Sequence, residues 1–209
     1  SNQGRAEEYK TLFPAVIDSW RSQWKNDTLP FYYAQIAPFA GYDSRNENSQ
    51  RVTSAELRES QMLTLSKPNV GMAITTDLGD AKSIHPPKKK EVGERLALWA
   101  LNKDYNFEDL VYSGPIYNSV NFNNGKALIS FEHTGSGLYC PDEKIKYFEI
   151  AGNDNKYYPA DSKITGDKVL VWSNNVPKPQ SVRLGWKNYF EINLFNKEGL
   201  PASSFRSKE

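Results

Sequence analysis

The sequence predicts an α/β layer over residues 1–107, followed by an all-β domain over residues 108–209. Before residue 107, helical patterns alternate with continuous apolar runs. After it, the chain consists of short runs in which apolar and polar residues alternate. The first pattern favours a parallel sheet covered by helices, and the second favours antiparallel sheets with one solvated face.

The first region begins with an expected helix over residues 7–25. Apolar residues recur there at three- and four-residue spacing, which places them on one helical face. They are Tyr9, Leu12, Phe13, Val16, Ile17, Trp20 and Trp24. A second helix is expected to begin with Thr53 or Ser54 as its N-cap and to end before Pro68.

Two continuous apolar runs, Phe31–Ile36 and Val70–Thr75, are predicted to be strands that pair in parallel, covered on both faces. Two strands alone make a marginal sheet with an unpaired edge. We therefore expect either further upstream polypeptide to complete the sheet or the chain to self-associate. A third helix should follow, with Pro86 and Pro87 in its first turn, and with Val92, Leu96 and Trp99 along one side.

The second region is predicted to be an antiparallel β-sandwich of roughly a hundred residues. Its runs "KALISFEH", "KVLVWS" and "SVRLGW" place alternate apolar residues on one face, and turn signals such as "NNGK" and "TGDK" separate such runs. The inward set is Ala127, Ile129, Phe131, Val169, Val171, Val182, Leu184 and Trp186. Trp172 or Trp186 is expected in or near the core.

Composition excludes several functions. The net charge of +1 gives no electrostatic case for nucleic acid. The single cysteine, Cys140, cannot form an intramolecular disulfide, and no cysteine and histidine spacing suits zinc, so we predict no metal and no cofactor. No apolar run reaches the roughly 20 residues that span a bilayer. We expect a soluble chain without a membrane partner.

The stretch "TTDLGDAKSIHPPKKK" carries the candidate chemistry. His85 lies in a loop after a predicted parallel strand, and open α/β sheets build their sites at that edge. Asp77 and Asp80 are near enough in sequence to orient an imidazole, although Asp80 equally fits a turn after Gly79. A surface or capping role for His85 is the alternative.

Other polar groups are assigned no chemistry. The basic run Lys88–Lys90 is expected to be a solvated face at the start of the third helix. "HTGSG", which begins at His133, follows a predicted strand and is expected to be a loop. Arg58, Glu59 and Gln61 in "ELRESQ" are expected to be solvated, unless one of them faces a neighbouring loop.

A series of blocks, in order, resembles the carboxy-terminal half of the sialate O-acetylesterases, which are SGNH, or GDSL-like, esterases. The blocks include "SNQGRAEEYKTLFPAVIDSWR", "LPFYYAQIAPF", "ELRESQ", "IHPPKKKEVGERLALWAL", "FEHTGSGL" and "NLFNKEGLPASSFR". The resemblance implies the carboxy-terminal part of a flavodoxin-like SGNH hydrolase domain, followed by a β-sandwich. It further implies hydrolysis of acetyl esters of sialic acids by a serine nucleophile with His85 as the base. Acetylated xylan or another acetylated sugar is the nearest alternative substrate.

The chain also departs from this family at three of its catalytic motifs. Its nucleophile belongs to a Gly-Gln-Ser-Asn type motif that does not occur in this chain. Its Gln-Gly-Glu-Ser-Asn type block, which helps to form the oxyanion pocket, is represented only by Ser1 and Asn2, unless these are foreign to the natural chain. The aspartate usual three residues before the histidine is replaced by Lys82, so Asp80 or a backbone carbonyl near Ser83 is the candidate partner of His85.

Three alternative hypotheses about function follow. In the first, the chain is one half of an esterase, and an upstream part supplies the serine. In the second, it is a noncatalytic carbohydrate-binding or interaction module, and in the third, it is a remnant that is inactive alone. The resemblance implies a periplasmic, secreted or lysosomal location.

Overall fold

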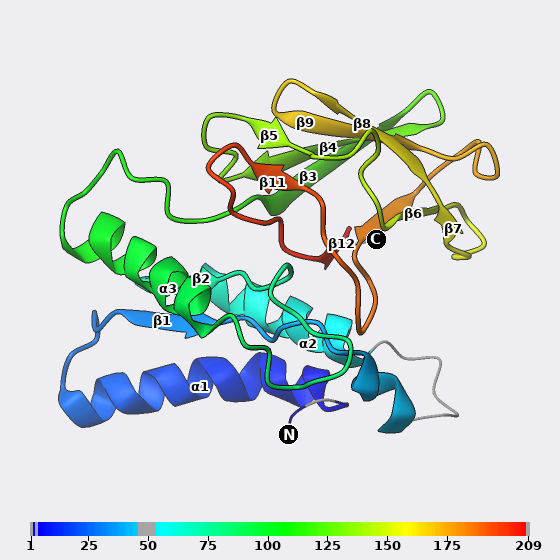
Figure 1. The fold of residues 1–209 in the computed structure, drawn as a ribbon. Coiled ribbons are helices and arrows are strands. Elements are labelled where there is room, and N and C mark those ends of the chain that lie inside the picture. The colour runs from blue at the N-terminus through cyan, green and yellow to red at the C-terminus, as the bar shows by residue number, and fades with distance from the viewer. Residues whose placement is uncertain (1, 3, 46–52, 208–209) are drawn as a thin grey trace. The chain divides into compact units, whose positions relative to one another are not determined.

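The computed structural model describes all residues except 1, 3, 46–52 and 208–209 (Figure 1). It combines helices, a parallel strand pair and antiparallel sheets, and it separates into two compact units. Unit 1 comprises Ser1–Ser113 together with Lys187–Tyr189. Unit 2 comprises Gly114–Trp186 and Phe190–Glu209. A short segment late in the sequence thus belongs to the first unit.

Unit 1 contains the predicted alternation of helices and strands. Its elements are α1 (Ala6–Trp24), β1 (Phe31–Ala34), η1 (Ala40–Arg45), α2 (Thr53–Leu63), η2 (Thr64–Ser66), β2 (Val70–Ala73) and α3 (Lys89–Asp104). β1 and β2 pair in parallel, from Phe31 opposite Val70 to Ala34 opposite Ala73, which confirms the predicted pairing. Each strand is two residues shorter than predicted. Just beyond β1, the Ile36 amide donates to the side chain of Gln61 (2.8 Å) on the edge that faces away from β2.

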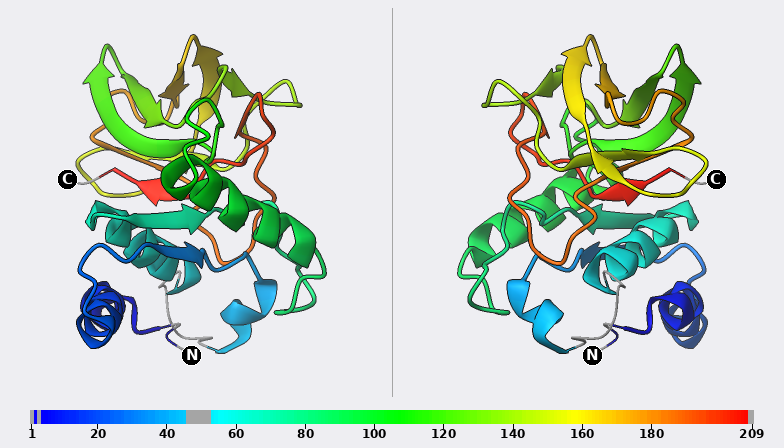
Figure 2. Two further views of the ribbon diagram at one scale, coloured as in Figure 1. Left: turned by 90° about the vertical axis from the view of Figure 1, so that its left-hand side faces the viewer. Right: turned by 90° about the vertical axis from the view of Figure 1, so that its right-hand side faces the viewer.

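Helices lie on both faces of this strand pair (Figure 2). The ring of Phe13 in α1 meets Tyr33 edge-on, with centroids 4.7 Å apart, while the neighbouring Tyr32 stacks against Trp99 of α3 at 6.3 Å. Successive strand residues point to opposite faces. The two tyrosines therefore anchor β1 to a helix on each side, as expected of a strand in a parallel sheet.

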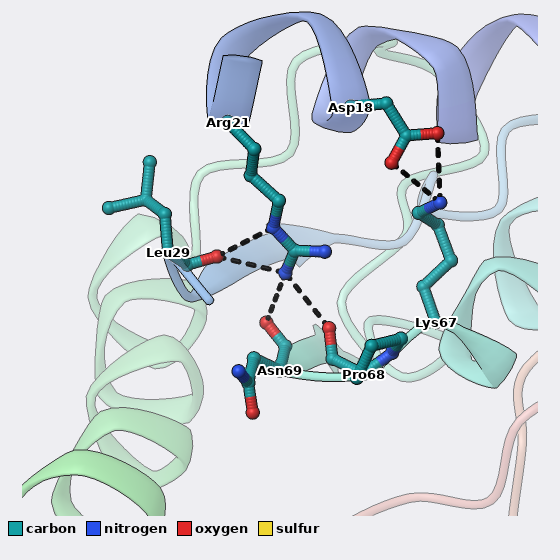
Figure 3. A network of polar contacts seen from close by, with 6 residues as sticks. All are labelled: Asp18, Arg21, Leu29, Lys67, Pro68 and Asn69. Atoms are coloured by element: carbon teal, nitrogen blue, oxygen red, sulfur yellow. Dashed lines mark hydrogen bonds and ion pairs between the residues drawn. The ribbon is translucent and has the colours of Figure 1, made fainter. Parts of the chain in front are cut away.

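A buried arginine holds the end of α1 to the sheet (Figure 3). Arg21, 5% exposed, donates to the carbonyls of Leu29 (3.0 and 2.8 Å) and Pro68 (2.8 Å), just before β1 and β2 begin. Lys67 pairs with Asp18 of α1 at 2.7 Å. These bonds satisfy backbone carbonyls outside the strand ladder and fix the position of α1.

The third helix begins later than predicted. α3 starts at Lys89, whose amide donates to the Pro87 carbonyl at 2.7 Å, so Pro87 begins a tight turn before the helix, and both prolines precede its first turn. Its buried residues are Arg95 and Trp99, whereas Val92 is only half-buried. The basic run around Lys88 is exposed, as predicted.

Unit 2 is built from short antiparallel strands. They are β3 (Ile116–Asn123), β4 (Lys126–Glu132), β5 (Leu138–Tyr139), β6 (Phe148–Ala151), β7 (Tyr158–Pro159), β8 (Asp161–Thr165), β9 (Lys168–Trp172), β10 (Ser181–Leu184), β11 (Phe195–Asn196) and β12 (Phe205–Arg206). They form two four-stranded sheets, ordered β3-β4-β9-β8 and β12-β10-β6-β7, and the smaller pair β11-β5.

The predicted inward residues of these strands are buried. Ile129, Val169, Val171, Val182 and Leu184 are all 0% exposed. Trp186 is buried and Trp172 is half-buried, which confirms one of the two tryptophans as a core residue. The "HTGSG" segment lies between β4 and β5 and forms a turn, as predicted. In β4, β9 and β10, alternation therefore identified the buried face of the strand.

Candidate active site

The loop after β2 begins at the carboxyl edge of the parallel pair. Thr75, 2% exposed, donates its hydroxyl to the carbonyl of Gln35 at 2.7 Å, so the segments that leave β1 and β2 are tied together at this edge. Open α/β sheets place ligands outside the carboxyl ends of their strands. The loop that carries His85 thus starts where such a site is expected.

Asp77 is held by an ion pair with α3. Both of its carboxylate oxygens accept from Arg95 at 2.6 Å, and the same guanidinium donates to the carbonyl of Ile74 at 2.7 Å. A bidentate pair of this kind fixes both geometry and charge. Asp77 therefore anchors the loop to α3, and its carboxylate is not positioned as an independent partner for an imidazole.

Asp80 shapes the turn before the histidine. Its Oδ1 accepts from the amides of Lys82 (2.7 Å) and Ser83 (3.3 Å), and its own amide donates to the Pro38 carbonyl at 3.2 Å. A Cβ at Gly79 would collide with that same carbonyl, so only glycine fits here. The turn role considered for Asp80 is thus observed.

His85 is exposed on this loop. Its amide donates to the hydroxyl of Ser83 at 3.1 Å, and the same hydroxyl lies 3.3 Å from the His85 carbonyl. Within the described part of the chain, the imidazole makes no hydrogen bond or ion pair, so the structure joins it to neither Asp77 nor Asp80. Catalytic hydrogen bonds often tighten only when substrate is bound, so an open imidazole remains compatible with a base.

Asn2 lies just before α1. It is exposed, and its carbonyl accepts the amide of Arg5 at 2.9 Å. Among the described residues, no hydrogen bond or ion pair joins it to the His85 loop. Its predicted neighbour in the oxyanion block, Ser1, lies outside them.

Polar residues of α2 are buried. Arg58 and Gln61, expected to be solvated, are 0% and 7% exposed. Burial lowers the pKa of Arg58 to about 9, which leaves the guanidinium charged at neutral pH. It donates to the hydroxyl of Ser54 at 3.4 Å and to the carbonyl of Lys187. The residues of "ELRESQ" were expected to be solvated unless one of them faced a neighbouring loop, and Arg58 does so through the Lys187 carbonyl. These hydrogen bonds offset the cost of burying its charge.

Asn188 caps α2 from 134 positions away. Its Oδ1 accepts the amide (3.1 Å) and the hydroxyl (2.8 Å) of Ser54, while its carbonyl accepts the amide of Phe39 at 3.0 Å. The side chain therefore satisfies a first-turn amide of the helix, the task that the sequence assigned to Thr53 or Ser54. It also fixes the segment after β1 that passes Gly79.

Replacing Asn188 by Ala should lower the free energy of unfolding by about 1–2 kcal/mol, since the Ser54 amide loses its cap inside a buried site. Hydrogen exchange at Ser54 should accelerate. Asn153→Ala, at an exposed turn position, is the control and should change neither quantity. Unchanged exchange at Ser54 in Asn188→Ala would show that the cap is dispensable.

Among the described residues, no group of three His, Cys, Asp or Glu side chains could hold a metal ion. No helix in the described ranges is long and apolar enough to cross a membrane.

Comparison with known proteins finds similarity to acetylesterases. No family model matches the chain. Sialate O-acetylesterases from Mus musculus and Homo sapiens are each 26% identical to it, over 87% and 68% of this chain. The crystal structure of a carbohydrate acetylesterase from Xanthomonas citri matches 96% of the chain at 40% identity, with a TM-score of 0.89.

The chain is much shorter than these relatives. It spans 36% of the mouse protein, 29% of the human protein and 46% of the Xanthomonas citri chain. The similarity nevertheless extends through both units. The predicted resemblance is therefore confirmed: this chain is related, along most of its own length, to the sialate O-acetylesterases and to a carbohydrate acetylesterase.

Proposed function

We propose that this chain is part of a carbohydrate O-acetylesterase of the sialate O-acetylesterase type, which hydrolyses acetyl esters of sialic acids. The observation that carries the proposal is the 40% identity, over 96% of the chain, to a carbohydrate acetylesterase. The exposed histidine in the loop that leaves the carboxyl edge of the parallel pair supports it. Unit 1 would then be the carboxy-terminal part of a flavodoxin-like SGNH domain, and unit 2 a β-sandwich.

In this proposal, His85 is the general base. Its imidazole takes the proton of a serine hydroxyl as the oxygen attacks the acetyl carbonyl, and returns that proton to the sugar oxygen as the carbon–oxygen bond of the ester breaks. The same imidazole then takes a proton from a water that attacks the acetyl-serine carbonyl, and returns it to the serine oxygen as the acyl–oxygen bond breaks and acetate leaves. The side chain suits both steps because an imidazole ring nitrogen can accept a proton and release it again.

The nucleophilic serine comes from an upstream half of the esterase. The absence of a Gly-Gln-Ser-Asn type motif from the 209 residues supports this assignment. Asn2 would contribute to the pocket for the oxyanion, with Asp80 setting the turn that presents His85. Asp80 is the candidate third member of the catalytic group, and its carboxylate would have to reach the imidazole when substrate is bound.

The isolated chain should release no acetate from 9-O-acetylated sialic acid. Joined to the part of the Xanthomonas citri relative that it does not match, it should gain this activity, and it should turn over the sialate ester faster than acetylated xylan. Acetate release can be followed by a coupled assay, with the relative's part alone as control. Rapid hydrolysis by the isolated chain would contradict the proposal and point to a nucleophile within it.

A further inference from the structure

The hydroxyl of Ser83 bonds both backbone groups of His85. It accepts the His85 amide at 3.1 Å and donates to the His85 carbonyl at 3.3 Å. A hydroxyl can do both at once, because it carries one donor and two lone pairs. The two bonds lie on either side of the His85 Cα, so one side chain restrains both peptide groups that set the direction of the imidazole.

Ser83 is itself held by the turn that Asp80 builds. Of residues 81–85, only Ser83 is half-buried, and the other four are exposed. The Oδ1 atom of Asp80 accepts the Ser83 amide at 3.3 Å, and the Asp80 amide donates to the carbonyl of Pro38 at 3.2 Å. Pro38 lies in the segment that leaves β1. A series of hydrogen bonds therefore runs from the segment after β1 to the backbone of His85.

The prolines after His85 restrain it from the other side. A residue before proline is pushed out of the α region into extended conformations, because the proline ring meets its backbone. Pro86 therefore narrows the backbone freedom of His85. Pro87 leads into α3, where the amide of Lys89 donates to its carbonyl at 2.7 Å. The backbone of the histidine is thus held before and after it, although the side chain is exposed.

This arrangement suits a base whose imidazole has no fixed partner. Arg95 binds both carboxylate oxygens of Asp77, and the carboxylate of Asp80 accepts amides of its own turn. Neither carboxylate orients the ring in this structure, so the place and direction of the His85 Cα–Cβ bond decide where the ring nitrogens can reach. A displacement of about 1 Å in a catalytic group can cost about 10²-fold in rate.

We propose that Ser83 is a positioning residue for the reaction: its hydroxyl clamps the backbone of His85, so that the imidazole points at the serine hydroxyl that it deprotonates. Ser83 itself touches neither the substrate nor the transferred proton. The inference rests on the proposed function, because it assigns a role in the reaction for which His85 would be the base. It adds that part of the catalytic geometry depends on a side chain that bonds only to backbone.

The first test compares Ser83 variants of the joined esterase, which is this chain linked to the unmatched part of the Xanthomonas citri relative. Ser83→Ala removes both bonds and should lower kcat about tenfold with little change in KM, because the base is displaced while substrate binding is not. Ser83→Thr keeps a hydroxyl and should retain most of the activity. Ser173→Ala is the matched control. The half-buried Ser173 hydroxyl also bonds a backbone carbonyl, that of Pro159 at 3.0 Å, and its loss should leave kcat unchanged.

A double-mutant cycle separates positioning from a general loosening of the loop. If Ser83 acts through the imidazole, Ser83→Ala should cost nothing further in a variant that already carries His85→Ala. An equal loss in both backgrounds would overturn the inference. A Ser83→Thr variant as slow as Ser83→Ala would overturn it as well.

A readout without catalysis distinguishes this inference from the proposed function. In the 209-residue chain, Ser83→Ala should speed the exchange of the His85 amide with solvent and lower its NMR order parameter, whereas Ser173→Ala should change neither. An unchanged His85 amide in Ser83→Ala would overturn the clamp. A joined esterase that releases no acetate, or one that His85→Ala leaves fully active, would contradict the proposed function, and the amide measurement would then decide the clamp by itself.

Discussion

His85→Ala in the joined esterase is expected to lower kcat/KM for 9-O-acetylated sialic acid by about 10³-fold, within the range for loss of a general base. The imidazole is exposed and makes no bond within the described chain, so its removal should leave folding unchanged. The far-ultraviolet circular dichroism and the urea midpoint should match those of the parent. A loss that falls entirely on KM would assign His85 to binding rather than to proton transfer.

Asp80→Asn separates the turn role of Asp80 from a catalytic one. An asparagine Oδ1 can still accept the amides of Lys82 and Ser83, so the turn should persist while the negative charge is lost. We expect a smaller loss of kcat/KM than in His85→Ala, because a backbone carbonyl can orient the imidazole. A loss as large as that of His85→Ala would instead make Asp80 the third catalytic residue.

Arg95→Met is expected to lower the free energy of unfolding by about 3–5 kcal/mol, because it leaves the largely buried Asp77 carboxylate and the Ile74 carbonyl without their cation. The loop that carries His85 should loosen, so the joined esterase should also lose activity. Urea unfolding measures the first effect, and hydrogen exchange over residues 74–85 measures the second.

Lys90→Met on the same helix is the control for this substitution. Its ion pair with Glu94 is largely exposed, so its loss should cost about 0.5 kcal/mol or less. The double variant Asp77→Leu/Arg95→Met should be more stable than the sum of the single changes predicts, because neither charge then remains buried alone. Additive losses would mean that the two side chains act independently.

Local patterns in the sequence predicted much of the fold. Apolar runs without alternation identified β1 and β2 as a parallel pair, and alternation identified the buried residues of β4, β9 and β10. Both patterns express which faces of a strand are covered, which is decided within a few residues. Helix boundaries were less certain, since Pro86 and Pro87 suit a turn as well as a helix start.

Long-range contacts could not be predicted in the same way. Nothing near Arg58 in the sequence signals that the Lys187 carbonyl will accept from it, or that Asn188 will cap its helix. Likewise, the spacing of the apolar residues in α1 predicts an apolar helix face. It does not predict that Ile17 is buried while the adjacent Val16 stays exposed. In the candidate site, the family resemblance together with the loop position made His85 the candidate base, which stays a prediction. The ion pair between Asp77 and Arg95 could not be foreseen, because it depends on how α3 packs.

The long-range cap on α2 affects when unit 1 can finish folding during synthesis on the ribosome. This helix is synthesised before unit 2, yet the side chain that satisfies its Ser54 amide belongs to residue 188, which emerges only after β3 through β10. Until then, the nascent first unit carries a buried helix end without its partner. We therefore expect cotranslational folding of unit 1 to finish late, and a stop codon before Asn188 to expose α2 to proteolysis even though its own sequence is unchanged.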